Sequence, residues 1–183
     1  LVAEISFLVK INYTIYMTGN KKTLVFVLVI LALSIFTHFI RFGHPNQTVF
    51  DEVHFGKFLS GYLTGEYFFD IHPPLGKLLL SAAGYVSGFK PGFSFANIGE
   101  VFPDKHYLAL RLLPVTAGTL LPIIIFFIAL RLGFSKRISL LTSLFIVFEN
   151  ALLVQSRFIL LDSTLLAFGF GAVLAYLNYK SSQ

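Results

Sequence analysis

The chain of 183 residues contains no cysteine. This absence excludes a disulfide framework and a thiolate metal site, and it leaves the redox compartment of the protein open. The only methionine is Met17, whereas the chain begins with Leu1. We therefore expect residues 1–16 to be a non-native or upstream extension and residues 17–183 to form the folded part.

Charged residues are also scarce, at 13% of the chain, whereas 56% of the residues are hydrophobic and 22 are Phe. This composition, with a mean hydropathy of +0.79, is typical of an integral membrane protein. Apolar runs predict four transmembrane helices, at residues 24–41, 108–131, 138–155 and 159–178. A signal peptide is the alternative for the first run, but no small-residue cleavage pattern follows it. The expected fold is therefore all-α and integral to the membrane.

The net charge of +5 fits membrane topology better than binding to nucleic acid. With four spans, the basic residues of the short connections all fall on one side of the membrane: Lys21, Lys22, Arg131, Lys136, Arg137 and Lys180. This bias makes that side cytoplasmic and puts the long connection 42–107 on the opposite side. We therefore expect the lipid bilayer, and not nucleic acid, as a partner.

One stretch of the long connection, residues 49–77, is rich in ionisable side chains: Asp51, Glu52, His54, Lys57, Glu66, Asp70, His72 and Lys77. A solvated loop would tolerate any polar sequence, but here apolar residues recur between the charges at helical spacing. The spacing predicts helices near 51–63 and 75–87, both too short to span a bilayer and therefore interfacial. We expect Asp51 to cap the first helix, and Pro73 and Pro74 to start the second.

Carboxylates and guanidinium groups gather on the non-cytoplasmic side in this topology: Asp51, Glu52, Asp162, Arg41, Arg111 and Arg157. A carboxylate can act as general base to a hydroxyl nucleophile, and arginine suits a phosphate. Acid beside arginine at the lipid boundary therefore fits group transfer from a lipid-linked phosphate. The alternative for Arg111, Arg157 and Asp162 is that they form structural ion pairs between spans.

Four sequence blocks, DEVHFGKF, YFFDIHPPLGKLL, LRLLP and FENALLVQSRFILLDS, occur in this order between Arg41 and Asp162. Together they resemble the protein O-mannosyltransferase family, the dolichyl- or polyprenyl-phosphate-mannose–protein mannosyltransferases of glycosyltransferase family 39. The resemblance implies a GT-C-type membrane glycosyltransferase. Such an enzyme moves mannose from the lipid phosphate to Ser or Thr hydroxyls of proteins, with inversion at the sugar carbon.

The same resemblance assigns roles to residues of this chain. Asp51 matches the catalytic acidic position, as general base, and Glu52 its neighbour. Arg111 and Arg41 match donor-phosphate ligands. Other side chains are expected to line the site: His54, His72, Lys77, Arg157 and Asp162. No cofactor is required. Acids near His54 and His72 could bind a divalent metal, but their spacing matches no standard metal site, so a metal is not indicated.

The resemblance covers the amino-terminal part of such an enzyme, since family members have more spans and many carry a large lumenal domain. We therefore expect a fragment, whose own activity the sequence does not establish. The membrane is expected to be a bacterial plasma membrane or that of the endoplasmic reticulum, with the site on the periplasmic, extracellular or lumenal side. A dimer with a family member is a further expectation.

Two alternatives stay open. The first is a GT-C transferase of another sugar, such as aminoarabinose or arabinose. The second is a non-catalytic membrane subunit or a transporter fragment. Transporters usually place charges near the bilayer midplane, whereas the charges here cluster at one face.

Overall fold

The computed structural model describes residues 21–182, and within them it shows helices and no strand. Residues 1–16, expected to be an extension, lie outside the described part. The helices are α2 (Lys21–Phe39), α3 (Glu52–Thr64), α4 (Pro74–Ser87), α5 (Tyr107–Arg131), α6 (Lys136–Val147), α7 (Asn150–Ser156) and α8 (Asp162–Ser182). The prediction of an all-α protein is confirmed for these residues.

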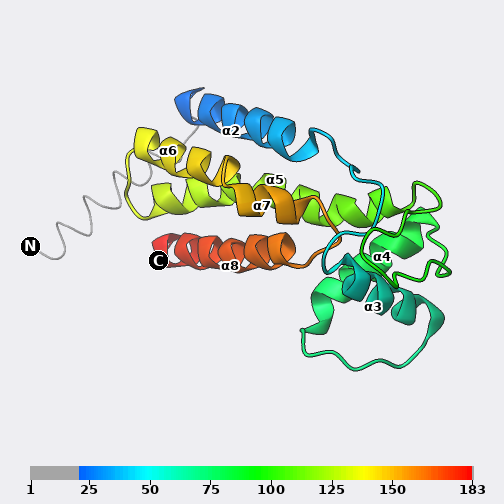
Figure 1. Cartoon of the computed structure of the whole chain (residues 1–183). Helices are drawn as coiled ribbons and strands as arrows, with labels where there is room; N and C mark the ends of the chain where they lie inside the picture. Colours follow the sequence, from blue (N-terminus) through cyan, green and yellow to red (C-terminus); the bar gives the residue numbers. More distant parts are fainter. Residues whose placement is uncertain (1–20, 183) are drawn as a thin grey trace, which may run out of the picture.

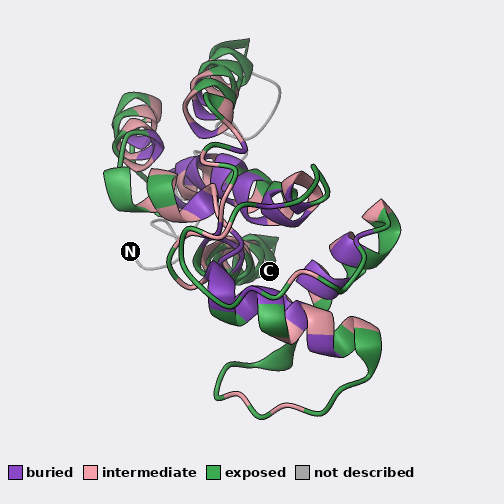
Figure 2. Ribbon diagram, turned by 45° about the vertical axis from the view of Figure 1, so that its right-hand side comes forward, coloured by how far each residue is buried: buried purple, intermediate pink, exposed green. Residues whose placement is uncertain are grey.

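Helix α5 lies at the centre of the molecule, and α2, α6, α7, α8 and α4 all pack against it (Figure 1). Burial follows this arrangement: α5 is buried along much of its length, whereas most of α8 and the outer face of α2 are exposed (Figure 2). The exposed side chains on these helices are large and apolar, as with Phe36 at 64% and Leu165 at 69% exposure. Such a surface is suited to lipid rather than water.

Two helices of the described part are long and apolar enough to cross a membrane, α2 and α5. A third span is present if α6 and α7 are counted together, although they meet at a bend of 57°. The bend falls inside the predicted span 138–155, because the Glu149 carboxylate accepts a hydrogen bond from the Leu152 N–H and starts a new helix there (2.7 Å). The final predicted span, 159–178, overlaps α8, a helix of 21 residues that is not among these candidate spans, so the fourth span stays a prediction.

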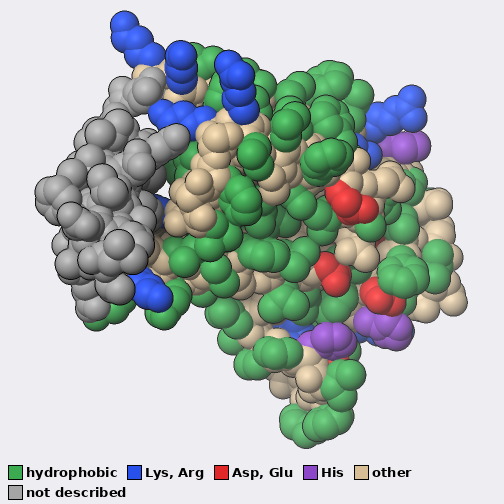
Figure 3. Space-filling view, turned by 90° about the vertical axis from the view of Figure 1, so that its left-hand side faces the viewer, with side chains coloured by type: hydrophobic (Ala, Val, Ile, Leu, Met, Phe, Trp, Pro, Cys, Tyr) green, Lys and Arg blue, Asp and Glu red, His purple; other side chains and the backbone are tan. Residues whose placement is uncertain are grey.

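The basic residues that indicated topology lie at one end of the bundle. The start of α2, the turn between α5 and α6 and the end of α8 all lie at the left of Figure 1, and α3 and α4 lie at the opposite end. A space-filling view shows Lys and Arg side chains along its upper edge, and Asp, Glu and His side chains gathered in its right half across a mainly hydrophobic surface (Figure 3). The basic residues of the short connections therefore lie at the end of the bundle away from the acid-bearing helices α3 and α4.

The helices α3 and α4 match the two short helices predicted near 51–63 and 75–87. Pro74 occupies the first turn of α4, as expected, because its missing N–H costs nothing there. The prediction that Asp51 caps α3 through its side chain was wrong: Asp51 occupies the N-cap position, but its carboxylate makes no capping hydrogen bond.

Two hydrophobic cores hold the helices together. One lies between α2, α5 and α6 and includes Ile30, Phe126 and Val147. The other joins α3, α4, the start of α5 and residues 158–161, and it is rich in aromatic side chains. In this second core the Phe95 ring fits against Gly56 of α3, where an added Cβ would lie only 2.2 Å from the ring. The second core fixes α3 and α4 on the end of the bundle.

Candidate active site

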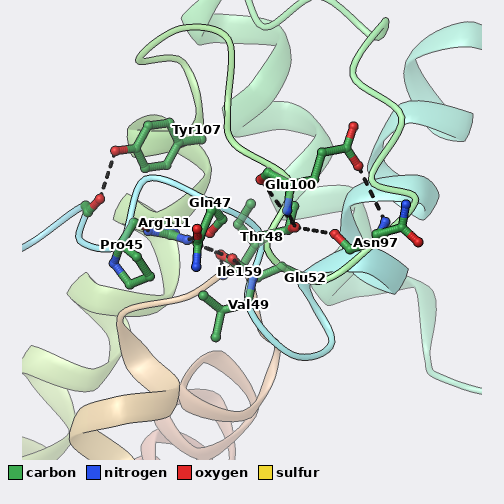
Figure 4. A network of polar contacts seen from close by, with 11 residues as sticks. Pro45, Gln47, Thr48, Val49, Glu52, Asn97, Glu100, Tyr107, Arg111 and Ile159 are labelled. Atoms are coloured by element: carbon green, nitrogen blue, oxygen red, sulfur yellow. Dashed lines mark hydrogen bonds and ion pairs between the residues drawn. The ribbon is translucent and has the colours of Figure 1, made fainter.

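Glu52 and Arg111 form an ion pair whose side chains are both fully buried. Arg111 Nε donates to Glu52 Oε1 (2.8 Å) and Arg111 Nη2 donates to Glu52 Oε2 (2.7 Å) (Figure 4). The pair joins the first turn of α3 to α5. A planar guanidinium suits this two-point contact, which is stronger and more directional than a single charged hydrogen bond.

The backbone completes the coordination of both charges. Glu52 also accepts hydrogen bonds from the N–H groups of Ile159 and Val49, both at 2.8 Å. Arg111 also donates to the carbonyls of Pro45 (2.7 Å) and Gln47 (2.9 Å). The Glu52 carboxylate therefore accepts four hydrogen bonds, about as many as its two oxygens can take. Four of the five N–H groups of Arg111 are used as well.

Aromatic rings surround the guanidinium. The Arg111 Cζ atom lies 5.0 Å from the ring centres of Tyr107 and Phe158 and 5.4 Å from that of Phe102. Cation–π attraction adds to the ion pair at such distances. Because Arg111 is fully buried and has one N–H left, it meets no outside ligand in this geometry. Its role as a phosphate ligand stays a prediction, and that role would need this cluster to open.

Asp51 differs from its neighbour. It is half-buried, and within the described residues its carboxylate has no hydrogen-bond or ion-pair partner. Successive residues at a helix start point about 100° apart, so Asp51 and Glu52 face different surroundings. Of the two adjacent acids, Glu52 uses both carboxylate oxygens in buried hydrogen bonds, whereas the carboxylate oxygens of Asp51 can still accept a hydrogen bond from a ligand.

A second polar cluster lies in the connection between α3 and α4. The Asp70 carboxylate contacts Nζ of Lys77 and Nδ1 of His72, the latter at 3.0 Å. Burial opposes ionisation, but the hydrogen bonds donated by Lys77 and His72 outweigh it and lower the pKa of Asp70 to about 2. Lys77 is 3% exposed and also donates to the His72 carbonyl (3.0 Å), with its Nζ 5.2 Å from the centre of the Phe58 ring.

An apolar groove lies between the start of α4 and the start of α8, and His72 is part of its lining. Its volume is about 190 Å³. It is lined by His72, Pro73, Leu75, Gly76, Leu79, Leu161, Thr164, Leu165 and Phe168. The His72 ring contacts Phe55, which lies one turn along α3 from Asp51 (5.6 Å between ring centres). The groove, His72 and Asp51 therefore lie at the same end of the molecule.

The remaining predicted site residues are more dispersed. Arg41 is exposed in the connection after α2, with a left-handed backbone (φ 57°), and His54 is exposed on α3. Arg157 donates through Nη2 to the carbonyl of Thr37, and Asp162 is the exposed first residue of α8. No ion pair links Arg157 to Asp162 in the described part of the chain.

The structure thus brings together Glu52 with Arg111, and His72 with Lys77. Asp70, which joins the second pair, was not among the predicted site residues. The only signal for it was its place two residues before His72, in the block that also contains Lys77. Within residues 21–182, no three His, Asp or Glu side chains are grouped closely enough to hold a metal ion.

These features define a helical membrane protein with an ordered acid-bearing connection at one end of its bundle. The sequence model described as "Dolichyl-phosphate-mannose-protein mannosyltransferase" matches residues 28–183. The chain therefore belongs to the dolichyl-phosphate-mannose–protein mannosyltransferase family.

Individual relatives agree with this assignment. Dolichyl-phosphate-mannose–protein mannosyltransferase 4 of Candida albicans is 42% identical over 147 residues, which is 79% of this chain and 20% of the relative. Mannosyltransferase 3 of Saccharomyces cerevisiae is 39% identical over 151 residues, 82% of this chain and 20% of the relative. Protein O-mannosyl-transferase 2 of Danio rerio is 34% identical over 160 residues, 87% of this chain and 21% of the relative. The chain thus spans about a fifth of their length.

A solved structure gives the same result. The fold is similar to a chain in the S. cerevisiae protein O-mannosyltransferase Pmt1–Pmt2 complex bound to the sugar donor, with a TM-score of 0.86 and 32% sequence identity. The match covers 90% of this chain and 23% of the other.

Proposed function

We propose that this chain forms the amino-terminal part of an enzyme that transfers mannose from a dolichyl phosphate donor to Ser or Thr hydroxyls of proteins. The observation that carries the proposal is the separation of roles between two adjacent acids: Glu52 is saturated with hydrogen bonds, and Asp51 is free to accept a proton. Family membership supports the choice of donor and acceptor.

The reaction uses Asp51 as general base. The acceptor hydroxyl attacks the anomeric carbon of mannose from the face opposite the phosphate, and its proton passes to the Asp51 carboxylate. The new bond joins the acceptor oxygen to the anomeric carbon. The bond from that carbon to the phosphate oxygen breaks, its electron pair leaves with the phosphate, and the configuration inverts. General-base assistance of this kind typically contributes about 10²–10⁴ in rate.

The Glu52–Arg111 pair supports this chemistry indirectly. Its hydrogen bonds join the start of α3 to Arg111 of α5 and to the backbone N–H of Ile159. They therefore restrain the backbone of α3 at the position of Asp51. A catalytic group is effective only when its position is held by packing and by hydrogen-bonded neighbours. Arg41, exposed in the preceding connection, is the arginine that is accessible to a donor phosphate.

For the membrane arrangement, we propose four spans: α2, α5, the bent pair α6 and α7, and α8. The apolar outer surfaces of α2 and α8 support it, as does the grouping of basic residues at one end. The site then faces the lumen of the endoplasmic reticulum. Because the similar solved structure is a complex of two mannosyltransferases, we also propose pairing with a family member.

The proposal is tested in a chimera, in which residues 28–183 replace the aligned segment of the S. cerevisiae relative. Microsomes that contain the chimera should transfer mannose from dolichyl phosphate mannose to a Ser/Thr peptide. The Asp51→Asn chimera should retain the protein level and lose the transfer. A chimera that reaches the membrane in normal amount and transfers no mannose would reject the proposed function.

A further inference from the structure

We propose that Arg157 is a positioning residue for mannose transfer, which holds the end of α2, and with it Arg41, in a fixed place relative to Asp51. The inference rests on the proposed function for the roles of Arg41 and Asp51. Its evidence is the connection between α7 and α8. There, three consecutive residues, Arg157, Phe158 and Ile159, each contact a different part of the candidate site.

Arg157 closes the carboxyl end of α2. Its Nη2 atom donates a hydrogen bond to the carbonyl of Thr37, in the last turn of that helix. The last carbonyls of a helix lack a partner within the helix, and the negative end of the helix dipole favours a cation there. Arg157, 120 residues further along the chain, therefore supplies both the missing donor and the charge.

The next two residues contact the ion pair at the start of α3. The centre of the Phe158 ring lies 5.0 Å from Arg111 Cζ, and the N–H of Ile159 donates to Glu52 Oε1 (2.8 Å) (Figure 4). The connection is tightened by a hydrogen bond from the Leu160 N–H to the Phe158 carbonyl (2.8 Å), and Ile159 is fully buried in the aromatic core. The connection thus joins the end of α2 to the start of α3.

The two groups whose separation this connection fixes belong to the proposed reaction. Arg41 lies two residues after the end of α2, and Asp51 lies immediately before α3. In an inverting transfer the phosphate and the base act on opposite sides of the anomeric carbon, so their separation has to match the sugar. An error of about 1 Å in such an arrangement can lower the rate about 10²-fold.

Helix α2 is also held by contacts that do not involve Arg157. Ser34 Oγ donates to the carbonyl of Thr119 in α5 (2.9 Å). The His38 ring packs against Gly118 of α5, where an added Cβ would lie 3.1 Å from His38 Cδ2. Loss of the Arg157 contact should therefore release the chain that follows α2 and leave the helix itself in place. This separation makes a positioning role distinguishable from a contribution to overall stability.

The contacts of Arg157 define a conservative and a disruptive substitution. Among the described residues its side chain makes one hydrogen bond, to the Thr37 carbonyl, and its buried Nε atom has no partner. Arg157→Lys keeps a donor and the positive charge, which are the two features that the end of α2 requires. Arg157→Met removes both and keeps an unbranched side chain. The matched control is Arg137→Met, at an exposed position of α6.

The first readout is steady-state mannose transfer by the chimera. Arg157→Met should lower kcat about 10–100-fold, because the base and the phosphate ligand no longer hold one separation. The KM for dolichyl phosphate mannose should change less than about threefold, since Arg41 is still present to bind the phosphate. Arg157→Lys should stay within about threefold of the unmodified chimera in both constants, and Arg137→Met should match it.

The second readout is the geometry itself, measured on the complete chain in lipid nanodiscs. The chain contains no cysteine, so Ile40→Cys and Lys57→Cys introduce two unique sites, both exposed. Spin labels at these sites report the distance between the end of α2 and α3 by pulsed electron spin resonance. We expect one narrow distance distribution for the unmodified chain, Arg157→Lys and Arg137→Met, and a broadened or shifted one for Arg157→Met.

Three results would overturn the proposal. The first is an unchanged kcat in Arg157→Met. The second is a lower kcat with unchanged label distances, which would mean that Arg157 acts on the substrate directly. The third is an equal loss of kcat and of Tm in Arg157→Lys and Arg157→Met, which would leave Arg157 with a structural role. If the chimera transfers no mannose at all, the proposed function fails, and the label distances in the complete chain still decide whether Arg157 fixes the end of α2.

Discussion

The buried Glu52–Arg111 pair should dominate the stability of this end of the molecule. In Glu52→Gln the side chain keeps its shape, but one oxygen becomes an amide nitrogen. Each Glu52 oxygen accepts one hydrogen bond from Arg111 and one from a backbone N–H, so the new nitrogen faces two donors whichever way the amide is turned. Arg111 also loses its countercharge in a site with no access to water.

Removal of one partner from a buried pair costs about 3–5 kcal/mol, because the other charge is left uncompensated. In a protein of this size, that free energy of unfolding corresponds to a decrease in Tm of roughly 6–20 °C. The assay is thermal unfolding of the purified chain in detergent. The matched control is Asp51→Asn, which changes the adjacent carboxylate in the same way and should cost less than about 1 kcal/mol, since no partner is lost.

The double variant Glu52→Gln/Arg111→Met provides a further check. With the buried charge gone, the loss of stability should be smaller than the sum of the two single losses, because the pair is coupled. A Glu52→Gln protein with the same Tm as Asp51→Asn would refute the reasoning, and so would strictly additive losses in the double variant.

Three other outcomes are expected. In the chimera, Asp51→Asn should lower mannose transfer by about 10²–10⁴ while donor binding persists, as determined by peptide mannosylation alongside lipid binding; unchanged transfer would exclude Asp51 as the base. Single cysteines at Glu66 and Ser135, introduced into a chain that has none, should react with an impermeant reagent from opposite sides of sealed membranes, and labelling from one side would contradict the four spans. The pKa of Asp70 is lowered from 3.8 to about 2, so its contribution to the free energy of unfolding is complete above pH 3.8 and is lost as the pH falls toward 2. The Tm measured from pH 5 to pH 2.5 should therefore fall more for the unmodified chain than for Asp70→Asn.

The helices were largely predictable, because the sequence itself contains the signals that form them. The period of the apolar residues located α3 and α4 to within a residue or two, and Pro73 and Pro74 marked the start of α4. The span 138–155 was predicted as continuous, although the polar pair Glu149-Asn150 interrupts it. Glu149 begins α7 through a local hydrogen bond, and hydropathy averaged over a span does not register such a bond.

The sequence did not indicate that Glu52 would form buried hydrogen bonds and that Asp51 would not. Both are acids, and they are adjacent in the chain. The difference arises from groups far away in sequence, namely the guanidinium of Arg111 and the N–H of Ile159, which reach Glu52 and not Asp51. The resemblance to the family could name the acidic pair, but only the three-dimensional arrangement distinguishes a saturated carboxylate from a free one.

The contacts of Glu52 also have a consequence for biosynthesis. Arg111 follows Glu52 by 59 residues and Ile159 follows it by 107 residues, so both partners are missing when Glu52 first emerges from the ribosome. At a synthesis rate of about 5–20 residues per second, the carboxylate waits roughly 5–20 s for its last partner. The buried ion pair at the start of α3 can therefore be completed only after the sequence before α8 has been made, and until then the Glu52 carboxylate lacks the N–H of Ile159.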